Sequence, residues 1–500
     1  MRGFGTFLTA FSALAAIGVV SPVIVAAQQA PPADRATTNL RDFDFVIDKV
    51  TANYAGWDSK VTPTNRAQLS DLTARLRAKV ATVSDTELAA LLAEWVDFFK
   101  DRHTRVYAQS VPAPAVAAGA VAPPSSYPSR PLTEAQARAR LGALGKARDP
   151  IEGIWRIGSD RYRIAILRNA RKPRIFSAIV LTTTAENWRP GQIKAEIQRD
   201  AKGGLQMLYR TGAHDEENVA AQVVAGGAAI LVTGWGTWTR DLPEVVDRDI
   251  VARQYPSDEL FLKALSPKTL WLRIPDFDPS RAAPLKALLA AHKAQIDKTP
   301  NLVIDLRSNG GGSDFVYEPI LPLVYTRPVY TIGIEMRASQ DNLALRRKIA
   351  DDIRAEAPAV AANLDIQNKQ MEGNFGGYFR PDPLPFSIDR LPTVVPYPRR
   401  VAVLIDGAGS TAEQFLLALR QSGKVTLMGQ SNSAGVLDFA NVVGMPTPSG
   451  RYRVQWATSR TLRLPGDPVD PDGIAPDIRI PAGEKDPVTH AAKWLERQVD

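Results

Sequence analysis

The sequence predicts an α/β core in its C-terminal half, preceded by a helical segment and an inserted small antiparallel β domain. Three observations indicate this architecture. From residue 266 onward, short apolar runs alternate with helical patterns, which is typical of an α/β core. Strand-like runs separated by polar turns occur within residues 150–262, and apolar residues recur at helical spacing in residues 38–108. The six predicted strands are residues 154–157, 162–167, 176–181, 193–197, 205–209 and 229–232. With 500 residues and 45% hydrophobic content, the chain is long enough for about three domains.

Residues 1–27 have the pattern of a secretory signal peptide. Arg2 supplies a positive charge, an apolar stretch rich in small residues follows, and residues 25–27 form a suitable cleavage site. The stretch is also long enough for a membrane anchor, but the polar residues from Gln28 onward favour cleavage. We therefore expect a periplasmic or secreted protein with no membrane span in its mature form. The absence of cysteine is compatible with that location.

Composition and periodicity divide the chain into six predicted segments. These are residues 1–27 (signal peptide), 38–108 (helical domain), 109–149 (Pro/Ala-rich linker and short helix), 150–262 (small β-barrel or sandwich), 266–485 (α/β domain) and 486–500 (C-terminal helix). In the helical segment, Ser84 and Glu87 have the spacing of a capping box. In the β domain, Trp188, Trp235 and Trp238 are compatible with a ligand surface, although aromatic residues in such domains more often form the core.

The charge and the histidine pattern exclude several classes of function. The net charge is +8, but lysine and arginine are interleaved with acidic residues and form no basic run. A solvated surface therefore explains the charge better than nucleic-acid binding does. With no cysteine in the sequence, thiol chemistry and cysteine-based zinc sites are excluded, and the four histidines show no metal-ligand spacing. We expect no metal and no cofactor, and the sequence leaves the oligomeric state open.

A serine lies between a predicted strand and a predicted helix. Residues 401–405 form a short apolar run typical of a buried strand, Gly407 and Gly409 permit a sharp turn, and helical spacing follows Ser410. The free N–H groups at a helix start stabilise a developing oxyanion, so this is a suitable place for a nucleophile. The alternative is that Ser410 is only an N-cap, a role that serine commonly fills.

A second predicted strand, residues 302–306, ends in a polar turn with three successive glycines, residues 310–312, and a helical run over residues 315–323 is predicted to follow. Such a turn lets the backbone approach a ligand closely and directs N–H groups at it. A flexible loop or a phosphate loop is the alternative, but the Gly-Lys-Ser/Thr ending of a phosphate loop is missing. Both this turn and Ser410 follow the carboxyl end of a strand, where open α/β sheets place their sites.

Two further segments carry polar residues in a recognisable order. Asp101-Arg102-His103-Thr104 ends an amphipathic helical pattern, and residues 470–477 read Asp-Pro-Asp-Gly-Ile-Ala-Pro-Asp. Together with the glycine turn and Ser410, these segments resemble the C-terminal-processing (tail-specific) and tricorn-core serine peptidase family. The four motifs occur in the order of that family. The resemblance implies a ClpP/crotonase-like core and hydrolysis of peptide bonds in a peptide or protein substrate.

The resemblance also implies roles for individual residues. Ser410 matches the nucleophile, and the N–H groups of Thr411 and Gly311 match the oxyanion hole. One branch of the family activates its serine with a lysine, but Val436 stands at that position here, and Lys424 lies near the far end of the helix. The other branch uses a histidine and a carboxylate, which here are His103 as general base and Asp470, which would orient the histidine or the water.

The chain departs from that second branch at two positions, and alternatives stay open. Arg102 replaces a serine, and Asp470 replaces a longer glutamate. His103 also suits a structural role at a helix C-terminus, and Asp470 precedes proline, as turn residues often do. A non-catalytic ligand- or peptide-binding protein on the same fold, as in the family's retinoid-binding relatives, is the second interpretation. An esterase or transpeptidase is the third.

Overall fold

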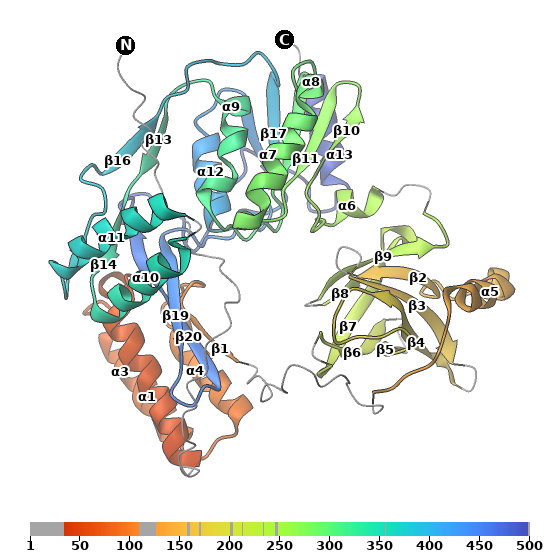
Figure 1. Cartoon of the computed structure of the whole chain (residues 1–500), viewed down its shortest axis with the longest axis horizontal. Coiled ribbons are helices and arrows are strands. Elements are labelled where there is room, and N and C mark those ends of the chain that lie inside the picture. The colour runs from red at the N-terminus through yellow and green to blue at the C-terminus, as the bar shows by residue number, and fades with distance from the viewer. Residues whose placement is uncertain are drawn as a thin grey trace. The chain divides into compact units, whose positions relative to one another are not determined.

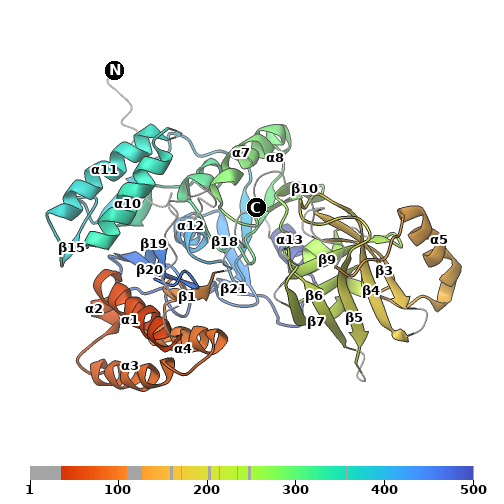
Figure 2. The same cartoon turned by 60° about the horizontal axis from the view of Figure 1, so that its bottom comes forward.

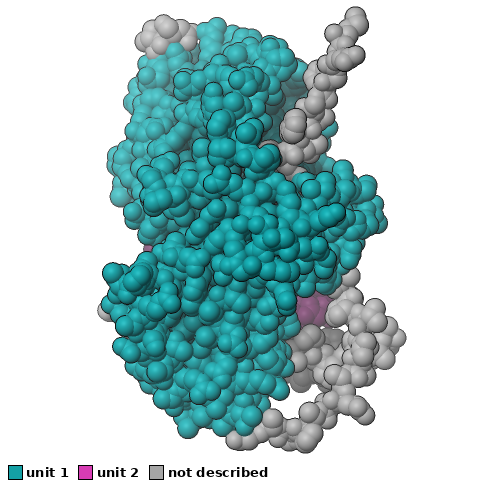
Figure 3. All heavy atoms as spheres, turned by 90° about the vertical axis from the view of Figure 1, so that its left-hand side faces the viewer, with its two compact units in different colours: residues 1–113, 261–482, 491–500 teal, residues 114–260, 483–490 magenta. Residues whose placement is uncertain are grey.

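The computed structural model describes most of the chain as two compact units, which Figure 3 colours separately. Residues 1–113, 261–482 and 491–500 form the first unit, and residues 114–260 and 483–490 form the second. The predicted signal peptide and most of the first half of the predicted linker lie outside the described residues. The described ranges are 35–109, 127–157, 161–169, 172–200, 204–212, 214–233, 235–245, 249–355 and 357–498.

Four helices begin the first unit (Figure 1), and the predicted capping box is confirmed in the last of them. Ser84 N–H donates to Glu87 Oε2 at 2.8 Å, and Glu87 N–H donates back to the Ser84 hydroxyl at 3.4 Å. The apolar sides of these helices share one core with residues of the antiparallel strands β19 (Phe439–Pro446) and β20 (Tyr452–Thr461). The helices are α1 (Arg35–Asn53), α2 (Trp57–Lys60), α3 (Arg66–Val80) and α4 (Asp85–Asp97).

That core rests on a five-stranded sheet in which β1-β20-β14-β15 are paired in this order and β19 also pairs with β20. Strand β1 directly follows the helical segment and pairs antiparallel with β20, almost 350 residues further along the chain (Figure 2). This pairing carries His103 to the C-terminal part of the chain. The strands are β1 (Arg105–Ala108), β14 (Ile334–Arg337), β15 (Tyr378–Phe379), β19 (Phe439–Pro446) and β20 (Tyr452–Thr461).

A second sheet of six strands forms the predicted α/β core, in the order β10-β11-β12-β17-β18-β21. All neighbours are parallel except β10 and β11. Strands β11 and β12 are buried along their whole length, as expected of a parallel sheet covered on both faces. The strands are β10 (Phe261–Ser266), β11 (Thr269–Arg273), β12 (Asn301–Asp305), β17 (Arg400–Leu404), β18 (Val425–Gly429) and β21 (Ile478–Arg479).

Helices flank the core strands, but one predicted helix is wrong. The continuous helical run expected over residues 315–323 is broken into η4 (Asp314–Val316), η5 (Glu318–Ile320) and α9 (Leu321–Val324), because Pro319 and Pro322 remove backbone donors. The other elements are α7 (Ala282–Ala291), α8 (Lys293–Ile296), β13 (Val329–Ile332), α10 (Gln340–Ile353), α11 (Pro358–Glu372), β16 (Phe386–Asp389), α12 (Thr411–Leu419) and α13 (Pro487–Arg497).

A buried ion-pair network shapes the turn that leaves β12. Asp305, at the end of the strand, accepts two hydrogen bonds of 2.8 Å from Arg307, and Arg273 lies 3.5 Å away. Burial would raise the pKa of Asp305, but Arg307 and Arg273 outweigh this effect and lower it. Arg273 also donates to the backbone oxygen of Arg307 at 2.7 Å. The turn before the three glycines is therefore fixed by charged groups that are almost completely buried.

The second unit contains a closed antiparallel barrel of eight strands, which decides between the predicted barrel and sandwich. Trp188 and Trp238 are buried in its core, whereas Trp235 is 38% exposed. Six of the eight strands were predicted from the sequence. The other two, β7 and β9, were not predicted, and β7 begins with three exposed polar residues. The barrel strands are β2 (Gly153–Ile157), β3 (Tyr162–Asn169), β4 (Lys172–Thr183), β5 (Ile193–Arg199), β6 (Leu205–Arg210), β7 (Glu216–Val224), β8 (Ala229–Val232) and β9 (Gly236–Leu242), with α5 (Glu134–Leu144), η1 (Gly145–Ala147), η2 (Ala225–Gly227) and α6 (Ile250–Gln254) beside them in the sequence.

Candidate active site

The glycine turn and the serine turn are side by side because β12 and β17 are parallel neighbours. Three hydrogen bonds join the two loops beyond the strand ends. Ser308 N–H donates to the Asp406 carbonyl at 2.8 Å, Gly409 N–H to the Asn309 carbonyl at 2.8 Å, and the Thr411 hydroxyl to the Gly312 carbonyl at 2.9 Å. The two segments that the sequence predicted at strand ends therefore form one structural element.

Ser410 occupies the N-cap position of α12 in an unusual backbone conformation. Its φ is 57° and its ψ is −124°, although a residue with a Cβ rarely adopts a positive φ. Such strain persists only where the surroundings hold the residue in place, and it is concentrated at functional sites. The serine side chain forms no cap hydrogen bond with the helix, and Ser410 is half-buried at the wall of a cleft. Its hydroxyl is therefore presented beside the helix start.

The surroundings that hold Ser410 centre on the buried carboxylate of Glu413. Its Oε2 accepts from the N–H groups of Ser410 at 3.1 Å and Val436 at 2.9 Å. Its Oε1 accepts from the Ser433 hydroxyl at 2.5 Å and the Gly435 N–H at 2.6 Å. Glu413 thus ties residues 433–436 to the first turn of α12. The role of Glu413 as an acceptor of four hydrogen bonds was not predicted from the sequence.

The two predicted oxyanion donors differ in their hydrogen bonding. Thr411 N–H donates to no acceptor among the described residues, whereas Gly311 N–H donates to Asn309 Oδ1 at 2.9 Å. Gly311 is also absent from the residues that line the cleft, although Gly310 and Gly312 line it. Gly312 N–H has no acceptor within the described part of the chain. Thr411 and Gly312 are therefore free to bind an anion, and Gly311 would first have to release Asn309.

Gly311 nevertheless has a clear steric role beside the serine. Its φ is +93°, and a Cβ at this position would lie 2.8 Å from each of Gly409 O, Ser410 Cβ and Thr411 N. Only a residue without a side chain permits so close an approach of the two loops. Gly311 therefore determines the fit between the loops, whichever N–H groups bind the oxyanion.

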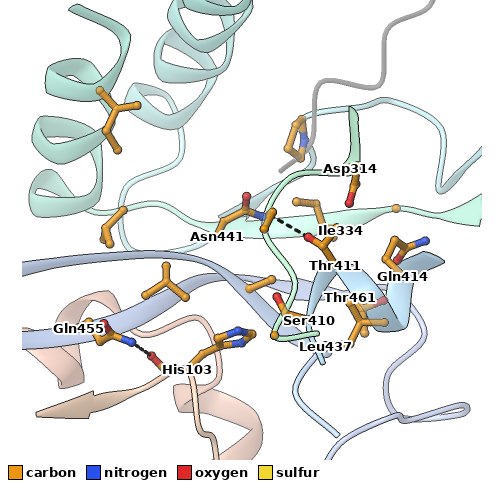
Figure 4. Close-up of a pocket in the computed structure, with 18 of the residues that line it drawn as sticks. His103, Asp314, Ile334, Ser410, Thr411, Gln414, Leu437, Asn441, Gln455 and Thr461 are labelled. Carbon is orange, nitrogen blue, oxygen red and sulfur yellow. Dashed lines mark hydrogen bonds between the residues drawn. The ribbon is translucent and has the colours of Figure 1, made fainter. Parts of the chain in front are cut away.

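A cleft of about 1240 Å³ lies in front of these loops. Ser410 and Thr411 line it together with His103, which comes from the N-terminal part of the chain (Figure 4). The two-stranded sheet of β13 and β16 borders the cleft with Ile332 and Phe386, both 40% exposed. The cleft is thus large enough for several residues of a peptide, with apolar side chains along part of its wall.

His103 lies beside Ser410, with its ring turned toward the serine (Figure 4). The ring atom Nδ1 lies 2.5 Å from the backbone oxygen of Phe439. Because a carbonyl oxygen can only accept, Nδ1 carries the proton, and in a neutral ring Nε2 then keeps its lone pair. His103 N–H also donates to Asp101 Oδ1 at 2.9 Å, which fixes the backbone of this residue. The geometry leaves Nε2 available as a proton acceptor.

Asp470 forms no hydrogen bond with His103. Its Oδ1 accepts instead from the N–H groups of Leu437 at 2.6 Å and Asp438 at 3.1 Å, just before Phe439 in the chain. Burial of the carboxyl group, together with the nearby charge of Asp438, raises the pKa of Asp470 to about 7. Asp470 therefore contacts the backbone next to Phe439, the residue whose carbonyl binds His103, and does not contact the imidazole ring itself.

The positions that depart from the family pattern are also accounted for. Val436 lies beside the turn that carries Ser410, because a Cβ added at Gly409 would be only 2.9 Å from Val436 Cγ2. An apolar side chain therefore fills the position at which the family has its lysine. Lys424 donates to the Val395 carbonyl at 2.6 Å and does not line the cleft. Arg102 donates to the Ala434 carbonyl. Neither position 436 nor Lys424 therefore provides a lysine amine to Ser410.

Within the described ranges, no group of histidine and acidic side chains is arranged to hold a metal ion. No helix in this part of the chain is both long and apolar enough to cross a membrane.

Comparison with known proteins adds a family match. Residues 268–480 match peptidase family S41. No curated protein matches the chain in sequence. Among solved structures, mature CPAF complexed with lactacystin is similar at a TM-score of 0.45 and 13% identity, covering 92% of this chain and 97% of that one. A putative peptidase from Parabacteroides merdae has a TM-score of 0.41 and 12% identity, covering 93% and 99%.

The photosystem II D1 C-terminal processing protease has a TM-score of 0.36 and 12% identity, covering 89% of this chain and 93% of that one. At TM-scores below 0.5, these likenesses assign no residue and no substrate to the chain.

Replacing Glu413 with glutamine should loosen the serine turn. An amide has one acceptor oxygen, so two of the four hydrogen bonds would be lost and buried donors left unpaired. We expect Glu413→Gln to lower the free energy of unfolding by about 2–4 kcal/mol. The measurement is urea unfolding, with Glu372→Gln, in a surface ion pair with Arg347, as the control. Equal stability of the two variants would contradict the role assigned to Glu413.

Stability should depend on pH through Asp470. Because its pKa is about 7 in the folded protein and about 4 in an unfolded chain, the folded state binds the proton more tightly. The stability gained from this tighter proton binding is fully present below pH 4 and is lost as the pH rises through 7. We expect the melting temperature of Asp470→Asn, relative to that of the wild type, to be higher at pH 8 than at pH 4. A difference that is constant across this range would show that Asp470 does not titrate there.

Proposed function

We propose that the chain, whose residues 268–480 match peptidase family S41, is an exported serine peptidase in which Ser410 attacks a peptide carbonyl and His103 accepts its proton. The observation that carries this proposal is the shared cleft. The Ser410 hydroxyl at the start of α12 and the His103 ring, which comes from a distant part of the chain, both line it (Figure 4). This arrangement supplies a nucleophile and a neutral base.

The proposed reaction follows the protonation of His103. Nε2 takes the hydroxyl proton as Ser410 Oγ forms a bond to the carbonyl carbon, and the same nitrogen then returns the proton to the leaving amine. The negative oxygen of the tetrahedral intermediate lies at the N-terminus of α12, where Thr411 N–H and the helix dipole stabilise it. One such donor typically contributes a factor of about 100–1000 to the rate. A histidine-based mechanism of the tricorn-core type fits a site whose lysine position holds Val436.

The proposed substrate is an extended peptide or protein segment. A cleft of about 1240 Å³ is larger than a single side chain needs. Exposed apolar residues on β13 and β16, among them Ile332 and Phe386, provide contacts for apolar side chains of that segment. The cleft alone does not select one sequence.

Covalent labelling tests the nucleophile and the base. A fluorophosphonate should label the purified protein at Ser410, and Ser410→Ala should abolish labelling with little change in melting temperature. We expect His103→Gln to slow labelling by at least about 100-fold, the usual contribution of a general base. The control is His292→Gln, because His292 lies at the end of α7 and does not line the cleft. A folded wild-type protein that resists labelling would favour the binding-protein interpretation, and equal effects of the two histidine variants would remove His103 from the mechanism.

Export is proposed from the sequence of residues 1–27. If the segment is a cleaved signal peptide, the protein recovered from the periplasm or medium should begin at Gln28. N-terminal sequencing of the protein expressed with its full leader measures this directly. An intact N-terminus in the membrane fraction would instead identify the segment as an anchor.

A further inference from the structure

The hydrogen-bond partner of the His103 ring is a backbone carbonyl, which is unusual for a catalytic histidine. In a Ser-His-Asp triad, a carboxylate accepts from Nδ1, fixes the tautomer and stabilises the imidazolium. Here Nδ1 lies 2.5 Å from the Phe439 oxygen, and no carboxylate among the described residues forms a hydrogen bond or ion pair with the ring. The position of that one carbonyl therefore decides which nitrogen of His103 faces Ser410.

Phe439 is held in place by a reciprocal arrangement of two aspartates. Asp470 Oδ1 accepts from the N–H groups of Leu437 and Asp438, the two residues that precede Phe439. In return, Asp438 Oδ2 accepts from the N–H groups of Val469 at 2.7 Å and Asp470 at 2.8 Å. Each carboxylate thus fixes the backbone of the segment that carries the other.

Two further contacts complete this clamp. The buried Asp438 Oδ1 accepts from Arg463 at 2.7 Å, which balances the charge of Asp438. Asp438 also accepts from Thr461 N–H through its backbone oxygen at 2.9 Å, and Phe439 begins β19 directly afterwards. The segment 437–439 is therefore fixed on both sides, and the Phe439 carbonyl has little freedom to move away from His103.

We propose that Asp438 and Asp470 are positioning residues, which hold the Phe439 carbonyl against His103 Nδ1, and that this carbonyl takes the place of the acidic member of a triad. The inference rests on the proposed function, in which His103 is the base. The proton of Ser410 moves to Nε2, while the Nδ1–H bond to Phe439 persists throughout the reaction. Asp470 acts on the reaction only through the backbone that it holds.

The electrostatics of Asp470 agree with this indirect role. The carboxyl is removed from water and faces the charges of Asp438 and Asp101, so that it is partly protonated at neutral pH. Such a group is a poor partner for an imidazolium ion, but its Oδ1 still accepts two N–H bonds in either protonation state. The clamp needs an acceptor at Oδ1 and does not need a negative charge.

A pair of substitutions separates the indirect role from a direct one. In a triad, replacing the aspartate with asparagine lowers the rate by about 10⁴, because the wrong tautomer forms. Here the carbonyl sets the tautomer, and an asparagine can still accept from Leu437 and Asp438. We expect Asp470→Asn to slow fluorophosphonate labelling of Ser410 by two- to tenfold, and Asp470→Ala by 100-fold or more. The control is Asp467→Ala, since Asp467 is exposed and its side chain forms no interaction among the described residues.

The pH dependence of labelling is a second measurement, and a purely structural effect of a substitution would not change the pH at which labelling rises. If the carbonyl is the partner of the ring, Asp470→Asn should leave the acidic limb of the profile, which reports His103, unchanged. A direct ion pair would instead shift that limb to lower pH in the asparagine variant.

The tautomer itself can be observed independently of activity. In protein with ¹⁵N-labelled histidine, the His103 resonances, assigned by their loss in His103→Gln, should show a protonated Nδ1 and an unprotonated Nε2 above the titration of the ring. Asp470→Asn should keep this pattern, and Asp470→Ala should give a mixture. This test remains valid if the protein is not labelled by the fluorophosphonate, so failure of the proposed function and failure of the inference are distinguishable.

Three results would overturn the inference. One is a loss of 1000-fold or more in Asp470→Asn with its fold intact, which would mean that the charge acts directly. Another is an Asp470→Ala variant that has the wild-type labelling rate and the wild-type His103 resonances. The third is a protonated Nε2 in the wild-type protein.

Discussion

The parallel pairing of β12 with β17 is the constraint on which the site depends. It brings two turns that lie about a hundred residues apart to the same edge of the sheet. The hydrogen bonds between Ser308 and Asp406, Asn309 and Gly409, and Gly312 and Thr411 extend that pairing beyond the strands. The strained conformation of Ser410 is tolerated because these bonds and the carboxylate of Glu413 hold its neighbours on both sides.

The parts of the fold and site that the sequence could predict are those with a local signature. The strand, glycine turn and helix around Ser410 each have a characteristic composition, so their order and their meeting at a sheet edge follow from short stretches. The barrel was also recognisable from alternating strands, although β7 begins with exposed polar residues and lacks that alternation. The helical run after residue 315 was mispredicted because apolar spacing was counted without the two prolines that interrupt it.

The remainder of the site depends on contacts that leave no mark in the sequence. A backbone carbonyl belongs to every residue, so nothing identified Phe439 as the partner of His103. The resemblance placed an acid at position 470, but whether that acid reaches the imidazole or the preceding backbone depends on where residues 437–439 lie. Likewise, only the folded loops show that Gly311 N–H is bonded to Asn309 while Thr411 N–H is not.

The pairing of β1 with β20 divides the site between two distant parts of the chain. The hydroxyl, the glycine turn and the anion-binding N–H groups all belong to the segment after residue 300, whereas the imidazole arrives on a short strand that follows the helices. A chain that began after β1 would lose the proton acceptor together with the helices that share a core with β19 and β20. The supply of a base to the serine therefore depends on the docking of one four-residue strand, whereas the serine and the glycine turn are held by the pairing of β12 with β17.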